Sequence, residues 1–178
     1  VLIPGGFGKR GTEGKIESIK YARQNKIPFL GICFGMQMSI IEFARNKLKI
    51  KKATSSEFGK GGIPIIGLIN EWNKDGKIIK GTDKNLGGTM RLGLYEAKLK
   101  DNSLIKNIYK SKSIKERHRH RYEVNIAYKD QFEKNGMIFS GLSPDNKLPE
   151  IIELKNHPWF IAVQFHPEFR SRPLAPHP

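Results

Sequence analysis

Two separated stretches of the sequence contain residue types that together could carry out nucleophilic catalysis. Cys33 stands between Gly31 and Gly35, where the apolar run 27–32 gives way to apolar residues at helical spacing. A sharp turn from a strand into a helix exposes the residue at its apex, and the helix N-terminus favours a thiolate there over a thiol. A lone cysteine is more often a small buried apolar residue, so the prediction of a nucleophile needs partners elsewhere in the chain.

The second stretch supplies those partners near the other end of the chain. His166 follows the apolar run 159–165, and Glu168 stands two residues later. A cysteine nucleophile requires a base, and the base requires a group that orients its ring. We predict that Cys33 is the nucleophile, His166 the general base and Glu168 the orienting carboxylate.

A glycine-rich turn at residues 4–8 follows the apolar residues 1–3. Its glycines permit positive φ angles and leave backbone N–H groups facing open space. The spacing matches neither the dinucleotide-binding loop nor the lysine-terminated phosphate loop. We therefore interpret the turn as one donor of an oxyanion hole, with the N–H of Phe34 as the other, and a plain tight turn remains the alternative.

The elements that would position these residues alternate along the first part of the chain. A strand end, a glycine turn, a helix over 15–25, the strand at 27–32 and the helix after Cys33 follow one another. Such alternation predicts an α/β fold with a mainly parallel central sheet flanked by helices, and a site at the carboxyl ends of its strands. Later in the chain we expect a hairpin turn at 74–77, a short helix at 103–109, and strands at 63–68, 94–99, 136–141, 150–154 and 159–165.

A cluster of arginines and histidines occupies residues 117–121. It could form an RNA-binding patch or, through His118 and His120, part of a metal site, but a zinc site would require further Cys or His ligands at matched spacing. In an extended segment the two histidines share one face and the arginines the other. We expect no metal site, and we expect the arginine face to bind a carboxylate with two parallel hydrogen bonds.

Composition limits the classes of function. The 178 residues suit one domain, and no apolar stretch is long enough to cross a membrane. The net charge of +15 would suit a nucleic-acid partner, but the lysines are scattered along the chain, so we expect a solvated basic surface and no nucleic acid. A single cysteine suits a reducing cytoplasm. Because the chain begins at Val1, in what looks like the end of a strand, we expect it to be a fragment of a longer protein.

Residues 31–37, together with 166–168, resemble the class I (triad) glutamine amidotransferases. More narrowly, the glutaminase domains of CTP synthases are similar to this chain in five blocks that span it nearly end to end. The resemblance implies a flavodoxin-like α/β fold, truncated at the N-terminus, and a single glutaminase domain over 1–178. The five blocks are residues 4–14, 87–93, 116–125, 157–160 and 165–173.

The resemblance also implies roles for individual residues. Cys33 would attack the side-chain amide of L-glutamine, and His166 and Glu168 would complete the triad. Position 34 is often leucine in the family and is Phe34 here, which should change packing and not mechanism, because the backbone N–H does the chemistry. The implied oxyanion hole is Gly6 and Phe34, and the implied substrate-binding residues are Gly6, Phe34, Gln37, Glu57 for the ammonium group and Arg121 for the carboxylate.

In the family this domain needs no cofactor. Its ammonia passes to a preceding synthetase domain, absent from this chain, which uses ATP, Mg²⁺ and UTP to make CTP in the cytoplasm, within a homo-tetramer. GTP activates the family allosterically, and the segments connected with that control would contain Arg10, Glu13, Thr89 and Arg91. The alternatives are the amidotransferase domain of another synthetase, a stand-alone glutamyl hydrolase, and a basic nucleic-acid-binding protein.

Overall fold

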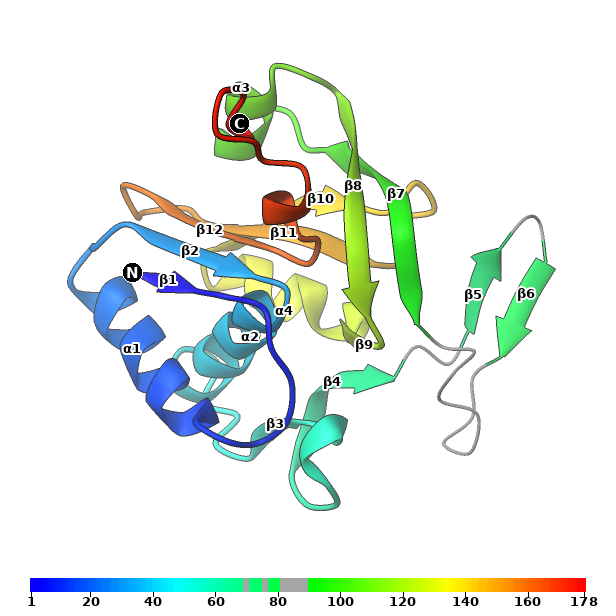
Figure 1. Ribbon diagram of the computed structural model, residues 1–178. Coiled ribbons are helices and arrows are strands. Elements are labelled where there is room, and N and C mark those ends of the chain that lie inside the picture. The colour runs from blue at the N-terminus through cyan, green and yellow to red at the C-terminus, as the bar shows by residue number, and fades with distance from the viewer. Residues whose placement is uncertain (69–70, 75–76, 81–89) are drawn as a thin grey trace.

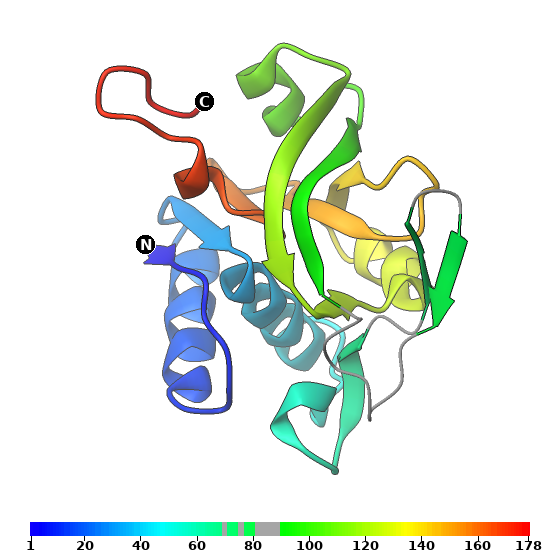
Figure 2. The same cartoon turned by 45° about the vertical axis from the view of Figure 1, so that its right-hand side comes forward.

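The computed structural model describes residues 1–68, 71–74, 77–80 and 90–178, and it is built around one seven-stranded sheet with helices on both faces (Figure 1). Figure 2 shows the long, curved β7–β8 ribbon crossing the central strands. The strands lie in the order β1 (Leu2–Ile3), β2 (Phe29–Ile32), β12 (Phe160–Val163), β11 (Pro149–Leu154), β10 (Met137–Leu142), β7 (Arg91–Leu99) and β8 (Ser113–His120).

The central sheet is mixed. Its β1–β2 and β2–β12 pairings are parallel, whereas β12–β11, β11–β10, β10–β7 and β7–β8 are antiparallel. The expected α/β fold with flanking helices is confirmed, but the prediction of a mainly parallel sheet is wrong. Parallel neighbours need a long crossover, and after residue 46 most consecutive strands of this sheet are joined by short connections that return the chain antiparallel.

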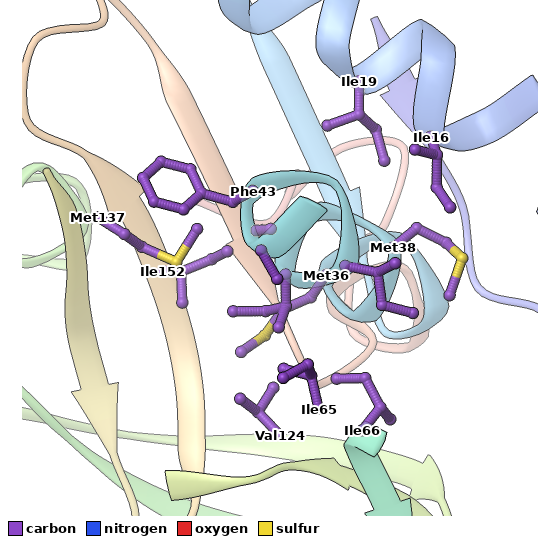
Figure 3. Close-up of a cluster of buried hydrophobic side chains, with 14 of the residues drawn as sticks. Ile16, Ile19, Met36, Met38, Phe43, Ile65, Ile66, Val124, Met137 and Ile152 are labelled. Atoms are coloured by element: carbon purple, nitrogen blue, oxygen red, sulfur yellow. The ribbon is translucent and has the colours of Figure 1, made fainter. Parts of the chain in front are cut away.

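Two long helices cover one face of the sheet. Helix α1 (Thr12–Gln24) buries one stripe of residues, as its sequence spacing predicts, whereas α2 (Phe34–Asn46) is buried from Phe34 to Ala44. Helix α2 therefore lies between the sheet and its other neighbours and forms the centre of the larger core. That core also contains Phe132 of the short helix α4 (Lys129–Lys134), and Figure 3 shows part of it around Met36, Met38 and Phe43.

A smaller core lies on the opposite face, beneath α3 (Leu104–Tyr109). The side chain of Ser103 caps this helix by accepting a hydrogen bond from the N–H of Lys106. The carboxylate of Glu153 on β11 accepts from the N–H groups of Leu104 and Ile105, at 2.9 and 3.0 Å. These contacts attach α3 to the sheet, and the C-terminal residues lie beside it.

The remaining elements are small. Strands β3 (Ala53–Ser55), β4 (Ile63–Leu68) and β9 (Tyr122–Val124) form one sheet, and β5 (Glu71–Lys74) pairs antiparallel with β6 (Lys77–Lys80). The predicted hairpin at 74–77 is confirmed by that pairing, although its turn residues 75–76 lie outside the described part of the chain. The 3₁₀ helices are η1 (Ser56–Phe58), η3 (Ile126–Tyr128) and η4 (Pro167–Phe169).

Candidate active site

Cys33 stands at a strained turn between β2 and α2, as its sequence context predicts. Its φ of 51° and ψ of −98° are unusual for a residue with a side chain, and its N–H donates to the carbonyl of Val163 at 2.7 Å. The flanking glycines are required because backbone passes close by. A Cβ on Gly35 would lie 2.2 Å from the carbonyl oxygen of Ile3, and one on Gly31 would lie 2.9 Å from Gly35 itself.

The thiol of Cys33 is almost entirely buried. Its sulfur accepts a hydrogen bond from Nε2 of Gln164 at 3.6 Å. Burial raises the pKa of Cys33 to about 12; the backbone N–H of Phe34 lowers it, and nearby carboxylates such as Glu123 raise it further. The N–H at the helix N-terminus thus acts in the expected direction, but burial outweighs it, so attack by Cys33 requires removal of the thiol proton.

His166 is held so that one ring nitrogen is bound and the other is not. Its Nδ1 lies 2.6 Å from Oε1 of Glu168, whereas Nε2 is buried without a hydrogen-bond partner in the described part of the structure. One face of the ring stacks on Phe169, with centroids 4.5 Å apart and planes at 7°. A Cβ on Gly5 would lie 2.8 Å from Cε1 of the ring, so only glycine fits there. Because a carboxylate accepts from Nδ1–H, Nε2 is left as the basic atom.

The three predicted catalytic residues line one cavity of about 670 Å³. The glycine turn, the end of β8 and the 3₁₀ helices η1 and η4 form its walls. Phe34, the other expected oxyanion-hole residue, does not line this cavity; its ring packs under Gly6, where an added Cβ would lie 3.6 Å from Cδ1 of Phe34. The structure thus brings together the catalytic Cys33, His166 and Glu168 with the expected substrate-binding residues Gly6, Gln37, Glu57 and Arg121 around one space.

The groups expected to bind the amino-acid end of a substrate are held by the backbone around them. Oε1 of Glu57 accepts from the N–H of Gly8 at 2.6 Å, which ties η1 to the glycine turn. Nε2 of Gln37 donates to the carbonyl of Tyr122 at 3.0 Å. Nη1 of Arg121 is buried and has no hydrogen-bond partner within the described residues. An unpaired buried guanidinium nitrogen at a cavity is well suited to an anionic ligand.

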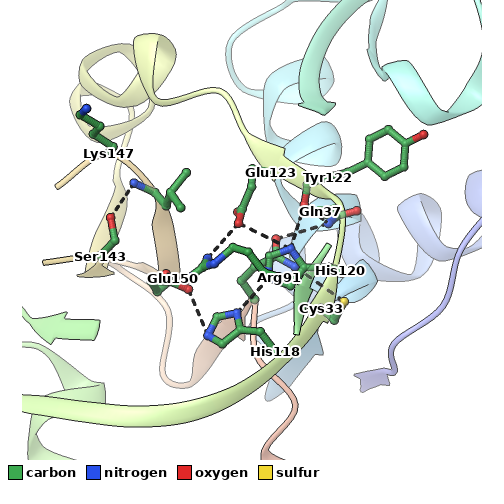
Figure 4. Close-up of polar contacts among 12 residues, drawn as sticks. Cys33, Gln37, Arg91, His118, His120, Tyr122, Glu123, Ser143, Lys147 and Glu150 are labelled. Carbon is green, nitrogen blue, oxygen red and sulfur yellow. Dashed lines mark hydrogen bonds and ion pairs between the residues drawn. The ribbon is translucent and has the colours of Figure 1, made fainter. Parts of the chain in front are cut away.

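The alternation predicted for 117–121 holds as far as the end of β8. His118 and His120 are buried, and Arg117 and Arg119 are exposed. The strand ends at His120, and Arg121 lies in the cavity wall between β8 and β9. Two further contacts of the site were not predicted from the sequence. The carbonyl of Tyr122 accepts from Gln37, and the side chain of Gln164 donates to Cys33 (Figure 4). Neither a backbone carbonyl nor a single glutamine forms a recognisable sequence pattern.

The model of the family "Glutamine amidotransferase class-I" matches residues 1–178. The chain belongs to the class I glutamine amidotransferase family. It is 84% identical over its whole length to the CTP synthase of Pelagibacter ubique and 60% identical to that of Zymomonas mobilis. In both comparisons this amidotransferase chain spans only 33% of the relative's length.

Two solved structures are similar in fold to this amidotransferase. The glutaminase domain of Trypanosoma brucei CTPS, solved with bound acivicin, superposes with a TM-score of 0.86 at 36% identity, covering 99% of this chain and 66% of that one. A glutamine amidotransferase from Thermotoga maritima covers 94% of this chain and 56% of its own, with a TM-score of 0.56 at 13% identity, a likeness of fold alone. Within the described residues, no helix of this amidotransferase is long and apolar enough to cross a membrane.

Among the residues that the resemblance connects with GTP control, Arg10, Glu13 and Arg91 do not line the cavity of this amidotransferase. Arg10 is exposed, and Glu13 forms an ion pair with Arg45 at 2.9 Å. Arg91 is buried and pairs with Glu123 and Glu150. Thr89 lies outside the described residues. In the part of the chain that the structure describes, no group of three or more His, Cys, Asp or Glu side chains is placed to hold a metal ion.

Proposed function

We propose that this chain is the glutaminase domain of a CTP synthase and hydrolyses L-glutamine to glutamate and ammonia. The observation that carries the proposal is the shared cavity, which Cys33, His166 and Arg121 all line, with Nε2 of His166 and Nη1 of Arg121 buried and unpaired among the described residues. The similarity to CTP synthases along the whole chain favours this function over a stand-alone glutamyl hydrolase or another synthetase.

The amino-acid end of glutamine carries one positive and one negative charge, and the cavity offers a partner for each. Arg121 would bind the α-carboxylate, since Nη1 is buried and unpaired among the described residues. Glu57 would bind the α-ammonium group, because one carboxylate oxygen is fixed by Gly8 and the side chain lines the cavity. Gln37, held on the carbonyl of Tyr122, would contact the substrate between them.

Acylation would begin when Nε2 of His166 takes the thiol proton of Cys33 and the sulfur attacks the side-chain carbonyl carbon of glutamine. The C–S bond forms as the carbonyl π electrons move onto oxygen, and the N–H groups of Gly6 and Phe34 would stabilise that oxyanion. Collapse of the tetrahedral species breaks the C–N bond, and His166 returns the proton to the departing nitrogen. Ammonia leaves and a glutamyl thioester remains on Cys33.

Deacylation would use the same residues in reverse. His166 takes a proton from water, the hydroxyl oxygen attacks the thioester, and the C–S bond breaks to release glutamate and return the thiol. Glu168 on Nδ1 would stabilise the imidazolium that forms twice in each cycle. The raised pKa of Cys33 fits this order of events, because proton transfer accompanies attack.

The fate of the ammonia extends the proposal beyond this chain, which spans 33% of its CTP synthase relatives. We place 1–178 as the glutaminase domain, with a synthetase domain elsewhere in the same protein using ATP and Mg²⁺ to aminate UTP in pyrimidine biosynthesis. A homo-tetramer, activation by GTP and a cytoplasmic location belong to the same proposal. GTP control through Arg10, Glu13, Thr89 and Arg91 would have to act on the site indirectly, since Arg10, Glu13 and Arg91 do not line the cavity.

The test is covalent labelling with 6-diazo-5-oxo-L-norleucine, a glutamine analogue with a reactive diazo-ketone. Intact mass and peptide mapping should show a single adduct on Cys33 that excess glutamine blocks. A Cys33→Ala variant should take no adduct and release no ammonia from glutamine, while its fold is retained because the change removes only the sulfur. Ammonia release by Cys33→Ala, or labelling that glutamine does not block, would refute the proposed site.

A further inference from the structure

A buried cluster of charged and titratable side chains adjoins the cavity through His120, which lines it; Figure 4 shows the contacts within the cluster. Arg91 on β7 donates to Oε1 of Glu123 at 2.9 Å and to Oε1 of Glu150 on β11 at 2.7 Å. All three side chains are at most 5% exposed. One guanidinium thus faces two carboxylates away from water, which leaves one negative charge too many for a buried site.

The two histidines of β8 connect this cluster to the cavity, and their contacts fix where the hydrogens are. Nδ1 of His120 lies 3.2 Å from the carbonyl oxygen of Tyr122, which can only accept, so Nδ1 carries the proton. In a neutral imidazole Nε2 of His120 is then an acceptor. Its neighbour at 2.8 Å is Nδ1 of His118, which must therefore be the donor.

This order leaves Nε2 of His118 with a lone pair. It faces Oε2 of Glu150 at 3.5 Å, an oxygen that is buried and has no hydrogen-bond partner in the described part of the structure. Two lone pairs that face each other away from water repel, so a proton is required between them. The same proton removes the excess negative charge of the pair around Arg91.

We propose that Glu150 is a neutral carboxylic acid, and that His118 and His120 are positioning residues. They connect Glu150 to the carbonyl of Tyr122 by successive hydrogen bonds, in which each group donates to the next. The hydrogen bonds run from Oε2–H of Glu150 to His118, from His118 to His120, and from His120 to that carbonyl. Glu150 is preferred to His118 as the site of the proton for an electrostatic reason. Burial raises the pKa of Glu150, whereas burial and the neighbouring Arg91 lower the pKa of His118.

The functional consequence rests on the proposed glutaminase activity. The carbonyl of Tyr122 accepts from His120 on one side and from Gln37 on the other, and its residue directly follows Arg121. A fixed carbonyl therefore fixes two of the groups expected to bind the amino-acid end of glutamine. His118 does not line the cavity, and His120 lines it beside Arg121. A role in holding Tyr122 predicts a change in KM and little change in kcat.

The first experiment uses the full-length protein and tests, without relying on activity, whether Glu150 is protonated. Glu150→Gln replaces the acid by an amide that also accepts from Arg91 and donates to His118, so Tm at pH 7 should change by no more than about 3 °C. Because the folded pKa of Glu150 is raised, wild-type stability should fall as pH rises above the pKa of an unfolded glutamate. Glu150→Gln should make that part of the pH profile shallower; the remaining slope belongs to Glu123, because burial raises its pKa to about 8.

Glu42→Gln is the matched control. Glu42 is also fully buried beside an arginine, but its carboxylate accepts from Arg23 and Asn46 and faces only donors. An amide there places N–H against N–H, so Tm should fall by about 5 °C or more. If Glu150→Gln loses as much stability as Glu42→Gln and leaves the pH profile as steep as in the wild type, Glu150 is ionised and the proposal is wrong.

The second experiment tests positioning by steady-state kinetics of ammonia release. His120→Leu should raise KM for glutamine about five- to tenfold, the worth of about one hydrogen bond, with kcat within about twofold of wild type. His120→Asn, whose side-chain amide can donate to Tyr122, should recover most of the loss. His157→Leu, at a histidine bonded to Ala22 on α1, is the matched control and should leave KM unchanged.

An unchanged KM in His120→Leu, or a fall in kcat alone, would overturn the positioning role. The two proposals also fail separately. If the wild-type protein released no ammonia from glutamine, the proposed function would be wrong, while the stability comparison of Glu150→Gln with Glu42→Gln would still decide the state of Glu150.

Discussion

Two of the molecule's imidazole–carboxylate pairs use the same chemical groups for different purposes. In the His166–Glu168 pair the carboxylate holds Nδ1 and leaves Nε2 facing the cavity. In the His118–Glu150 pair the carboxylate faces Nε2, and Nδ1 is bound to a second histidine. A histidine can transfer protons to a substrate only through a nitrogen that no protein group occupies. The open pair therefore suits catalysis, and the closed pair suits positioning.

Solvent access separates the two pairs further. The side chain of Glu168 is 48% exposed, and its Oε1 lies 2.6 Å from Nδ1 of His166. The side chain of Glu150 has no exposed surface, and burial raises its pKa. Predictions that break one pair should accordingly affect rate, and predictions that break the other should affect stability and substrate affinity.

The largest effect on rate is expected from the open pair. His166→Ala removes the group that takes and returns the proton, so kcat for ammonia release should fall about 10²- to 10⁴-fold. The free energy of unfolding should fall by about 1–3 kcal/mol, because the hydrogen bond from Nδ1 to Glu168 and the stack on Phe169 are lost. The check is kcat by ammonia assay together with a denaturation curve. An unchanged kcat would mean that another group is the base.

The largest effect on stability is expected from the closed cluster. Arg91→Leu leaves Glu123 and Glu150 without their cation, and loss of one partner of a buried pair costs about 3–5 kcal/mol in the free energy of unfolding. The double variant Arg91→Leu/Glu123→Leu should lose less, because a neutral Glu150 then leaves no buried charge. Denaturant titration of both variants measures the difference. A double variant no more stable than Arg91→Leu would show that an unpaired charge remains on Glu150.

The open pair was predictable from sequence, and the closed cluster was not. Cys33 at a glycine-flanked turn, and a histidine two residues before a glutamate, form patterns within short windows, and one mechanism connects them. The alternation over 117–121 also predicted that His118 and His120 share a face. No local pattern shows that Arg91, Glu123 and Glu150 meet, because charged residues are usually exposed and their contact joins three strands.

Contacts between distant segments, which no short pattern reveals, also decide the strand directions of the sheet and the pKa of the thiol. Residues 1–46 show the alternation of strands and helices that is typical of a parallel sheet. The direction of each later strand depends on which strand it pairs with, and the length of a connection does not reveal that partner. The helix N-terminus at Cys33 was correctly located, but the burial that raises its pKa comes from the folded structure around it. GTP control, expected at Arg10, Glu13, Thr89 and Arg91, stays a prediction.

The smallest effect is expected from Phe169, which packs against His166 of the open pair but forms no hydrogen bond with it. Phe169 stacks on His166 at 4.5 Å, and the ring's orientation otherwise depends on the hydrogen bond to Glu168 and the close approach of Gly5. Phe169→Leu keeps an apolar side chain but loses the stack, which is worth about 0.5–1.5 kcal/mol, so kcat should fall about two- to tenfold. KM should stay constant, because Arg121, Glu57 and Gln37 are not touched. A rise in KM with constant kcat would show that Phe169 contacts glutamine and does not act through His166. The orientation of His166 would then not depend on Phe169.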